Sequence, residues 1–449
     1  MADSRAMSGR RSWHSVRPSP ELLPLLVLAA LLGAPRAQEA AAPATKTAPQ
    51  AGTDAHARIE DFHGLRIVHT WGTPQQRGHA HGLLLANDIA AAMRLEFAAR
   101  FERRQALLEQ ARKALPRLIE YPADVRAEIE ALYQGIVDSG VSRALGGIDR
   151  DFDLDDVLIA NALDVFGLMG CSGFTVWGDQ VEGGGVLTGR NFDWPFTGPH
   201  LLDQTIVLVQ HGDDGTAVAS VTWPGYVGTV TGIDEEGVAA FLHVGSARIT
   251  LAPEPGSWPT AVAAREILQQ AHGDDPAQVF ATAQTLLSNT SPPAGFLTRI
   301  VLPQAPASGS PAGLFETDSR KCVRAVVDGP CVVTNHFLTR TDGREASGDS
   351  IEREKQVHAC IDRCLHEGDH HISVAEGWEM LGAVQRGGGK RFGTLHSLVF
   401  RQQPWCFELR LASLQDGKLV AAPQSERRFQ LPRELLFPAN PAQAEPAHR

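Results

Sequence analysis

The chain has 449 residues, of which 43% are hydrophobic and 21% charged. That composition is ordinary for a globular protein with one large hydrophobic core or two modest ones. Its 41 Lys and Arg residues and 52 Asp and Glu residues give a formal net charge of -11. Nucleic acids and anionic lipid surfaces are bound through concentrated Lys and Arg, so the charge balance argues against either partner.

The N-terminal segment has the layout of a secretory signal peptide. Four arginines between residues 5 and 17 precede an apolar run at 22–34, and small residues follow. The run is shorter than the roughly 20 residues that a membrane-spanning helix needs. We therefore expect residues 1–37 to be a signal peptide, residues 38–57 to be a flexible Ala- and Pro-rich linker, and the protein to be exported to the periplasm or the extracellular space.

The next part of the chain shows helical periodicity. Apolar residues recur at three- and four-residue intervals in three segments, at 83–115, 122–137 and 153–169. Each of the last two begins with Pro or Asp, which favour helix starts. We expect residues 58–170 to be mainly helical.

After residue 170 the pattern changes to short strands separated by turn signals. Helices are predicted within this part at 257–271 and 275–287, with Ser257 and Asp275 as N-caps, and later at 349–366 and 374–384. The predicted strands lie at 173–178, 183–194, 204–225, 235–245, 296–303, 322–329, 331–335 and 394–412. Such alternation favours an α+β fold in which helices cover sheets, with the helical N-terminal part packed alongside.

Six cysteines occur, at positions 171, 322, 331, 360, 364 and 406. Cys322 and Cys331 flank a turn-like stretch and are candidates for a bridge between neighbouring strands, although sequence alone does not decide the pairing. Cys360 and Cys364 share one face of a predicted helix, which is more typical of packing.

Cys171 follows Gly170 at the junction between the helical part and the strands. A buried structural thiol is one interpretation, because free Cys often behaves as a small core residue. A nucleophilic thiol instead needs a cation or base that favours the thiolate, and donors for an oxyanion. The stretch "GRNFDW" would return along a hairpin and bring Arg190 and Asp193 beside Cys171. The alternative is a surface ion pair on a hairpin.

Four short motifs in this order resemble one superfamily. They are "QRGHAHG", "GCSGF", "LTGRNFDW" and "VVTNHF", and together they are similar to the cysteine branch of the N-terminal-nucleophile hydrolases, which includes penicillin acyltransferase, acid ceramidase and bile-salt hydrolases. The resemblance implies a four-layer αββα sandwich. It also implies autoproteolysis between Gly170 and Cys171, which would divide the chain into a small subunit, 58–170, and a catalytic large subunit, 171–449.

The resemblance also implies roles for single residues. Cys171 would be the nucleophile and Arg190 the cation that stabilises its thiolate. Asp193 would hold the new α-amine, Asn335 would bind the substrate or intermediate, and Arg353 would complete the polar network.

The family's oxyanion-donating asparagine has no counterpart in the segment "DEEGVAAFLHVG", where His243 or Val244 occupies its place. His243, a backbone N–H or Asn335 could supply that hydrogen bond.

The chemistry at Gly170 is consistent with self-cleavage. Attack on the preceding carbonyl requires a strained and closely approached peptide, and glycine removes the side chain that would obstruct it. Cleavage frees an α-amine whose ordinary pKa is about 8, close enough to neutrality to act as a base.

Histidines offer competing interpretations. His336 could act as a papain-type base for Cys171. His79 and His81, and the "HEGDHH" stretch at 366–371, could suggest metal binding, but a helix start and a solvated loop are the favoured interpretations. We expect no metal and no cofactor.

The predicted function is hydrolysis of a linear amide through a thioester, with a small-molecule N-acyl amide as substrate. This is a hydrolase acting on carbon-nitrogen bonds other than peptide bonds. Acyl transfer to another amine is the close alternative, and hydrolysis is preferred because an exported protein would lack acyl-CoA. The two cleaved chains would remain associated. A papain-like thiol hydrolase without autoproteolysis and a non-enzymatic exported binding domain are the competing hypotheses.

Overall fold

The computed structural model describes residues 52–443, except 99–100, 102–104, 168, 214–215, 248–254, 274, 308, 328, 368 and 388–391. The predicted signal peptide, residues 1–37, lies outside the described residues, as does most of the predicted linker. None of the helices in the described residues is long and apolar enough to cross a membrane.

One of the two main sheets has ten strands in the order β1-β2-β3-β6-β7-β8-β9-β10-β11-β12. Neighbours pair antiparallel throughout, except that β3 and β6 are parallel. The strands are β1 (Gly52–Asp54), β2 (Ala57–Phe62), β3 (Leu65–Trp71), β6 (Ile206–His211), β7 (Val218–Thr222), β8 (Thr231–Asp234), β9 (Ala239–Val244), β10 (Phe296–Val301), β11 (Ala312–Thr317) and β12 (Cys322–Ala325).

The other main sheet has six strands in the order β13-β4-β5-β14-β15-β18, all antiparallel. They are β13 (Cys331–Val333), β4 (Gly170–Trp177), β5 (Val186–Trp194), β14 (Gly393–Arg401), β15 (Cys406–Leu411) and β18 (Arg427–Gln430). A separate small hairpin joins β16 (Ser413–Gln415) and β17 (Lys418–Val420).

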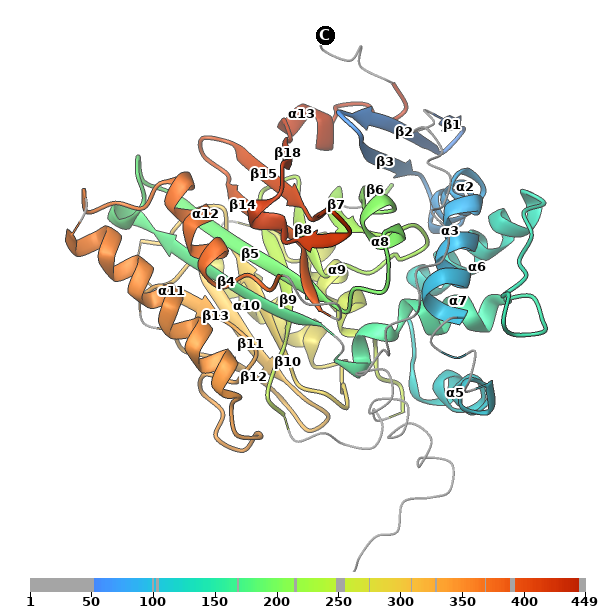
Figure 1. Ribbon diagram of the computed structural model, residues 1–449, viewed down its shortest axis with the longest axis horizontal. Coiled ribbons are helices and arrows are strands. Elements are labelled where there is room, and N and C mark those ends of the chain that lie inside the picture. The colour runs from blue at the N-terminus through green and yellow to red at the C-terminus, as the bar shows by residue number, and fades with distance from the viewer. Residues whose placement is uncertain are drawn as a thin grey trace, which may run out of the picture.

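Helices cover the outer face of each main sheet (Figure 1). On the ten-stranded sheet, Ile267 of α9 (Thr260–Gln270) and Phe280 of α10 (Pro276–Leu287) pack in one apolar cluster with Ile300 of β10. On the six-stranded sheet, α11 (Gly348–Glu367) and α12 (Val374–Ala383) bury Val357 and Leu381.

The inner faces of the two sheets pack against each other. Phe241 of β9 lies in the same buried cluster as Leu398 of β14 and Leu409 of β15. Each strand exposes alternate side chains to this shared interior. The α+β class and the four-layer αββα arrangement expected from the sequence are therefore confirmed.

The N-terminal part lies beside the sandwich, at the right in Figure 1. Its helices are α2 (Pro74–Leu84), α3 (Ala86–Ala92), the π-helix η1 (Met93–Ala98), α5 (Gln105–Leu118), α6 (Ala123–Asp138), α7 (Leu154–Asn161) and the 3₁₀ helix η2 (Leu163–Phe166). Short helices elsewhere are η3 (Gly178–Gln180), α8 (His200–Asp203), η4 (Ala422–Gln424) and α13 (Arg433–Leu436).

The N-terminal part also contains strands that the sequence analysis did not expect. The predicted linker, 38–57, reaches into β1, which pairs with β2. The segment that begins at residue 58 is mainly helical but also contributes β2 and β3 to the ten-stranded sheet. The N-terminal part is thus joined to the sandwich through a shared sheet as well as through its helices.

The "RGHAHG" motif belongs to α2, where its glycines allow very close packing against α6. A Cβ at Gly78 would lie 2.2 Å from the Glu128 carbonyl oxygen, and one at Gly82 would lie 1.9 Å from that of Leu132. The structural interpretation of this motif is therefore supported by the backbone contacts of its glycines.

Two further predictions were wrong. All six cysteines are free, and Cys322 and Cys331 lie in different sheets rather than on neighbouring strands. Ser257 does not cap a helix: α9 begins at Thr260, whereas the Ser257 hydroxyl accepts a hydrogen bond from the Ser291 backbone N–H. Asp275 does cap α10, as predicted, by accepting from the Ala277 N–H at 2.9 Å.

Candidate active site

The β4–β5 hairpin brings the predicted residues together. Across this pair Cys171 is opposite Phe192, and Gly170 is opposite Asp193. Because side chains alternate along a strand, Cys171 and Arg190 point to the inner face, toward the ten-stranded sheet. Gly170 and Asp193 belong to the outer face. The dipeptide 170–171 is therefore approached by a cation on one side of the sheet and a carboxylate on the other.

The Cys171 thiol is fully buried and lies against the Arg190 guanidinium. Nη2 of Arg190 donates to Cys171 Sγ at 3.0 Å and to the Leu242 carbonyl oxygen at 2.6 Å. Nη1 donates to the Val230 carbonyl oxygen and the Thr231 hydroxyl. Burial raises the pKa of the Cys171 thiol, and the neighbouring Arg190 charge opposes that rise.

The backbone of Cys171 is held by two more predicted residues. Its N–H donates to Asn335 Oδ1 at 3.1 Å, and its carbonyl oxygen accepts from Arg353 Nη1 at 2.8 Å. Arg353 Nη2 donates to the same Asn335 oxygen at 2.9 Å, and Asn335 Nδ2 donates to the Val244 carbonyl oxygen. Asn335 and Arg353 therefore orient the peptide units on both sides of the Cys171 α-carbon.

The Asp193 carboxylate is fully buried beside Gly170. Its Oδ1 accepts from the Thr394 hydroxyl at 2.6 Å, and Arg386 Nε lies 3.5 Å from Oδ2. Oδ2 accepts no hydrogen bond among the described residues, and a Cβ built on Gly170 would lie 3.3 Å from it. Burial raises the pKa of Asp193, against the lowering effect of the Thr394 hydrogen bond and the nearby arginines.

Gly170 allows other side chains to approach the backbone closely and does not adopt a strained backbone conformation. Its φ is outside the left-handed region, so the expected backbone strain is not observed. A Cβ there would instead lie 2.9 Å from the Phe392 ring as well as close to Asp193. Any side chain at this position would push the ring or the carboxylate away.

His243 lies on β9 and is fully buried, and neither ring nitrogen has a hydrogen-bond partner among the described residues. Burial lowers its pKa well below the ordinary value, and the positive charges of Arg190, Arg299 and Arg353 add to this effect. The ring is therefore neutral at physiological pH, with one N–H available as a donor.

Arg299 is a buried cation near the thiol that the sequence analysis missed. Its Nη2 donates to the Gly189 carbonyl oxygen at 2.8 Å, and its guanidinium lies over the Phe241 ring. Burial lowers its pKa to about 10. A Cβ at Gly173 would lie 2.6 Å from Nη2, so the glycine leaves room for it. The signal in the sequence was an arginine inside the apolar strand "FLTRIV".

His336 does not reach Cys171. Its Nδ1 lies 2.8 Å from the Ser350 hydroxyl, and its Nε2 lies 3.2 Å from the Glu354 carboxylate. The geometry argues against the papain-type pair.

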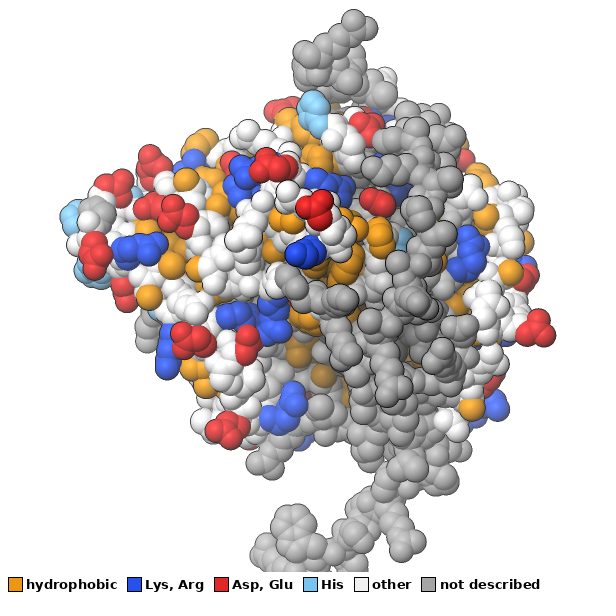
Figure 2. Space-filling model, viewed as in Figure 1, with side chains coloured by type: hydrophobic (Ala, Val, Ile, Leu, Met, Phe, Trp, Pro, Cys, Tyr) orange, Lys and Arg blue, Asp and Glu red, His pale blue; other side chains and the backbone are white. Residues whose placement is uncertain are grey.

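The other histidines form no metal site among the described residues. His79 is on the surface, 2.9 Å from Asp138, whereas His81 is buried and accepts the Gly225 N–H. His366, in the last turn of α11, and His370, in the exposed stretch after it, each bond to a backbone carbonyl oxygen. Figure 2 shows acidic and basic side chains interspersed over the face in view.

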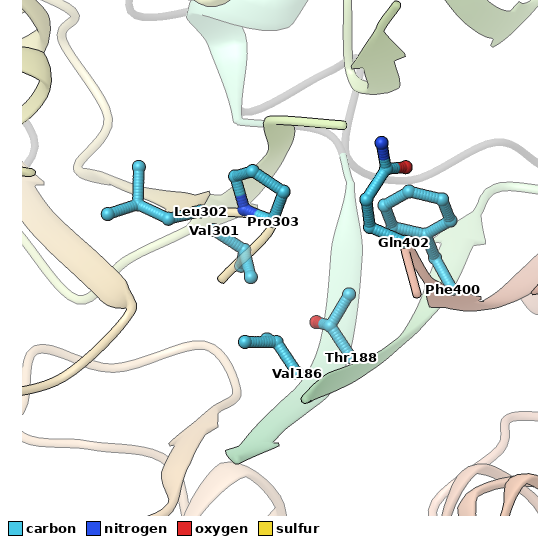
Figure 3. A pocket seen from close by; sticks show the side chains of 7 residues that line it. All are labelled: Val186, Thr188, Val301, Leu302, Pro303, Phe400 and Gln402. Atoms are coloured by element: carbon cyan, nitrogen blue, oxygen red, sulfur yellow. The ribbon is translucent and has the colours of Figure 1, made fainter. Parts of the chain in front are cut away.

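A small hollow lies near the end of the β4–β5 hairpin that is far from Cys171. Figure 3 shows the side chains that line it. Its lining includes Val186 and Thr188 of β5, Val301 of β10 and Phe400 of β14. Thr188 is four residues along β5 from Phe192, the partner of Cys171, which corresponds to about 13 Å along a strand. This hollow is therefore separate from the candidate active site.

One curated relative is similar to part of the chain. It is an uncharacterized protein from Archaeoglobus fulgidus, 26% identical over 236 residues, or 46% of this chain and 37% of that protein. The chain thus spans little more than a third of that relative's length.

Solved structures with similarity include a mutant conjugated bile acid hydrolase from Clostridium perfringens, at 10% identity and a TM-score of 0.36, covering 58% of this chain and 96% of that chain. Another is the Caenorhabditis elegans ortholog of N-acylethanolamine-hydrolyzing acid amidase, at 13% identity and a TM-score of 0.35, covering 58% and 100%.

The family model for acyl-coenzyme A:6-aminopenicillanic acid acyl-transferase matches residues 181–416. The matched region includes Arg190, Asp193, Asn335 and Arg353 and begins ten residues after Cys171. It covers more than half of the chain. The protein therefore belongs to the acyl-coenzyme A:6-aminopenicillanic acid acyl-transferase family, among the N-terminal-nucleophile cysteine hydrolases.

Proposed function

We propose that this protein is a cysteine amidohydrolase that activates itself by cleaving the bond between Gly170 and Cys171. One observation carries the proposal: the thiol, the N–H and the carbonyl oxygen of Cys171 are each bonded to a different polar side chain, namely Arg190, Asn335 and Arg353. A merely structural cysteine needs none of these contacts.

In the self-cleavage step the thiolate of Cys171 attacks the carbonyl carbon of Gly170. The C–N bond breaks as the acyl group moves from nitrogen to sulfur, and the nitrogen takes up a proton. Water then hydrolyses the thioester, which leaves a carboxylate on Gly170 and a free α-amine on Cys171. Burial of the thiol in the uncut chain fits this step, because the attacked carbonyl belongs to the adjacent residue.

In the mature enzyme the freed α-amine would act as the general base. Its nitrogen is the one that donates to Asn335 Oδ1 in the uncut chain. The Oδ2 atom of Asp193, which lies close to Gly170 and has no hydrogen bond among the described residues, would accept from the protonated amine. The amine would take the thiol proton, the thiolate would attack the substrate amide, and the amine would then protonate the leaving group.

His243 is the proposed oxyanion donor. Its ring is neutral and buried, and the charges of Arg190, Arg299 and Arg353 act on it. Neither ring nitrogen has a hydrogen-bond partner among the described residues. A neutral imidazole N–H can donate to a developing negative charge without adding a formal charge. The histidine would thus replace the asparagine that the family resemblance implies at this position.

The proposed substrate is a small N-acyl amide, and the proposed reaction is hydrolysis. The preference for water over an acyl acceptor depends on export, since acyl-CoA is absent outside the cytoplasm.

Export is itself a proposal from the apolar run at 22–34. N-terminal sequencing of protein from its native host should find roughly the first 37 residues removed, and retention of Met1 would contradict it.

Intact-mass measurement tests the central proposal. Wild-type protein should give two chains, one ending at Gly170 and one beginning at Cys171. Cys171→Ala should fold as one uncleaved and inactive chain, and Cys171→Ser should cleave slowly, because a hydroxyl is the weaker nucleophile. A single active wild-type chain, together with loss of activity in His336→Ala, would overturn self-cleavage in favour of a papain-like mechanism.

A further inference from the structure

The segment just before the proposed cleavage site is tied to the sandwich by a buried carboxylate. Asp164 lies in η2 and is 2% exposed. Its Oδ2 accepts from the Ala261 backbone N–H at 3.1 Å, and its Oδ1 accepts from the Tyr226 hydroxyl at 3.1 Å. Ala261 belongs to the first turn of α9, where unpaired N–H groups and the helix dipole favour a negative charge.

Asn161, at the end of α7, makes a second buried tie. Its Nδ2 donates to the Gly225 carbonyl oxygen at 2.9 Å, and its Oδ1 accepts from the Val227 N–H at 2.9 Å. Asn161 and Asp164 both precede residue 170, whereas these four partners all follow it. The two side chains therefore connect the two parts that cleavage would separate.

Gly167 allows the chain to pack closely against the sandwich. It adopts φ +63° at the end of η2, and a Cβ there would lie 2.7 Å from the Ala294 Cβ. Six residues lead from Asp164 to Gly170, and Met169 is buried among them. The carbonyl that the thiol must attack thus emerges from a short segment that is held at several points.

We propose that Asp164 and Asn161 are positioning residues for self-cleavage, which hold the upstream flank so that the Gly170 carbonyl stays within reach of the Cys171 thiol. The inference rests on the proposed self-cleavage and adds to it. Intramolecular attack depends steeply on geometry, and a misplacement of about 1 Å can cost on the order of a hundredfold in rate. Asp164 touches neither the thiol nor the scissile bond, so it acts through the segment that it holds.

The energetics of Asp164 favour this role over simple stabilisation. Burial raises its pKa to about 6, despite the hydrogen bonds that it accepts. A folded-state pKa above the unfolded value means that ionisation of this group lowers the stability of the fold as the pH rises from about 4 to about 6. The ionised carboxylate is therefore kept at a cost to stability, while both of its oxygens accept hydrogen bonds from the downstream part.

The test compares Asp164→Asn with wild type in a pulse-chase experiment on the full chain, made by cell-free translation. The measured quantity is the rate at which the single chain converts into two. Asp164→Asn should convert at least tenfold more slowly, because an amide cannot accept at both positions. Glu128→Gln is the matched control: Glu128 is also a buried upstream carboxylate bonded to a downstream residue, Arg265, but it is remote in sequence from Gly170.

The outcomes separate this inference from the proposed function. If the wild-type chain does not convert at all, self-cleavage itself fails. If wild type converts and Asp164→Asn converts at the same rate, only the positioning role is overturned. Equal slowing in Glu128→Gln would also overturn it, because a general loss of stability would then account for both variants.

The pH dependence of the conversion rate distinguishes a positioning role from a purely structural one, because a purely structural role would not change it. Tyr226, on the loop after β7, and Tyr121, just before α6, are titratable groups that face Asp164, and burial keeps both neutral by raising their pKa values. The ratio of wild-type to Asp164→Asn rates should be at least ten at pH 7.5 and should approach one near pH 5, where Asp164 is also neutral. A constant ratio would overturn the proposal.

Discussion

At the residue scale, the candidate site contains more buried positive than negative charge. Arg190, Arg299 and Arg353 are buried near Cys171, whereas Asp193 is the carboxylate next to the proposed cleavage site. An excess of positive charge favours the thiolate over the thiol and opposes the effect of burial. The arrangement suits a nucleophile that must be activated inside a closed interior.

Arg190 and Asp193 should both be required for turnover. Arg190→Ala removes the guanidinium that contacts Sγ, and Asp193→Asn removes the charge proposed to hold the α-amine. Each change should lower kcat on acyl p-nitroanilides by about a hundredfold or more, as for other preorganised charges. Arg126→Ala is the control, because Arg126 is a surface residue paired with Glu130. Full activity in Asp193→Asn would contradict the role of that carboxylate.

His243 can be tested by comparing two substitutions. His243→Asn keeps an N–H donor, whereas His243→Phe keeps an aromatic ring but cannot donate. If the ring N–H stabilises the oxyanion, His243→Phe should lower kcat by roughly a hundredfold with little change in KM, and His243→Asn should retain much more of the activity. Equal kcat values in the two variants would show that the donor lies elsewhere.

Cys171, Arg190 and Asp193 were predicted as neighbours from the hairpin register. Asn335 and Arg353 lie 164 and 182 residues from Cys171 and were predicted through the family resemblance. Asp164 and Arg386 were missed for a physical reason. Their partners, Ala261 and Asp193, are 97 and 193 residues away along the chain. Only the packing of the sandwich brings such pairs together, and no local pattern signals it.

At the scale of elements, periodicity predicted the amphipathic helices well and the strands less completely. The β2–β3 hairpin was missed because its two-residue turn, His63 and Gly64, lacks the Asn-Gly or Asp-Gly signal typical of hairpins, although both residues have positive φ. The predicted cap at Ser257 was wrong because Pro259 lies between it and the helix, whereas Asp275 directly precedes its helix.

The close contact of α2 with α6 predicts how a substitution at Gly82 changes the stability of the protein. Alanine is the better helix former by about 1 kcal/mol, yet its Cβ would lie 1.9 Å from the Leu132 carbonyl oxygen. Overpacking of this kind typically costs about 1–3 kcal/mol or more, so the clash should dominate. Gly82→Ala should lower the free energy of unfolding, measured by urea denaturation of the uncleaved Cys171→Ala protein.

Gly382→Ala is the control for that measurement. Gly382 also lies in a helix, α12, but a Cβ there meets nothing within 4 Å. The substitution should leave the free energy of unfolding unchanged or raise it by up to about 1 kcal/mol. Equal effects of the two substitutions would show that helix propensity, rather than the contact between α2 and α6, decides the result.

At the scale of the whole molecule, the proposed cleavage site does not separate two structural units. The part before residue 170 contributes three strands to the ten-stranded sheet, where β3 pairs with β6 from the other side of the site. Glu128 adds a buried ion network, accepting from Arg77 and Gln210 as well as from Arg265. Two chains produced by cleavage should therefore stay associated without any covalent link.

This interface should make the molecule sensitive to acid through His81. The ring accepts the Gly225 N–H at 3.1 Å, which requires it to be neutral. Burial lowers the pKa of His81 to about 4, with Arg265 adding to the effect and Glu128 opposing it. The unfolded chain binds this proton more readily than the folded chain. The contribution of neutral His81 to stability is therefore fully present above pH 6.5 and is lost as the pH falls toward 4. The difference corresponds to about 3 kcal/mol.

His81→Gln should remove this contribution, and His79→Gln provides the matched control two residues away. His79 lies at the surface beside Asp138, so its replacement should leave the pH dependence of the parent protein nearly unchanged. The free energy of unfolding is measured in urea at pH 7 and pH 4 on the uncleaved Cys171→Ala protein. Between these values His81→Gln should lose about 3 kcal/mol less stability than the parent. If both variants lose as much as the parent, protonation of His81 does not limit the stability of the interface between the two parts.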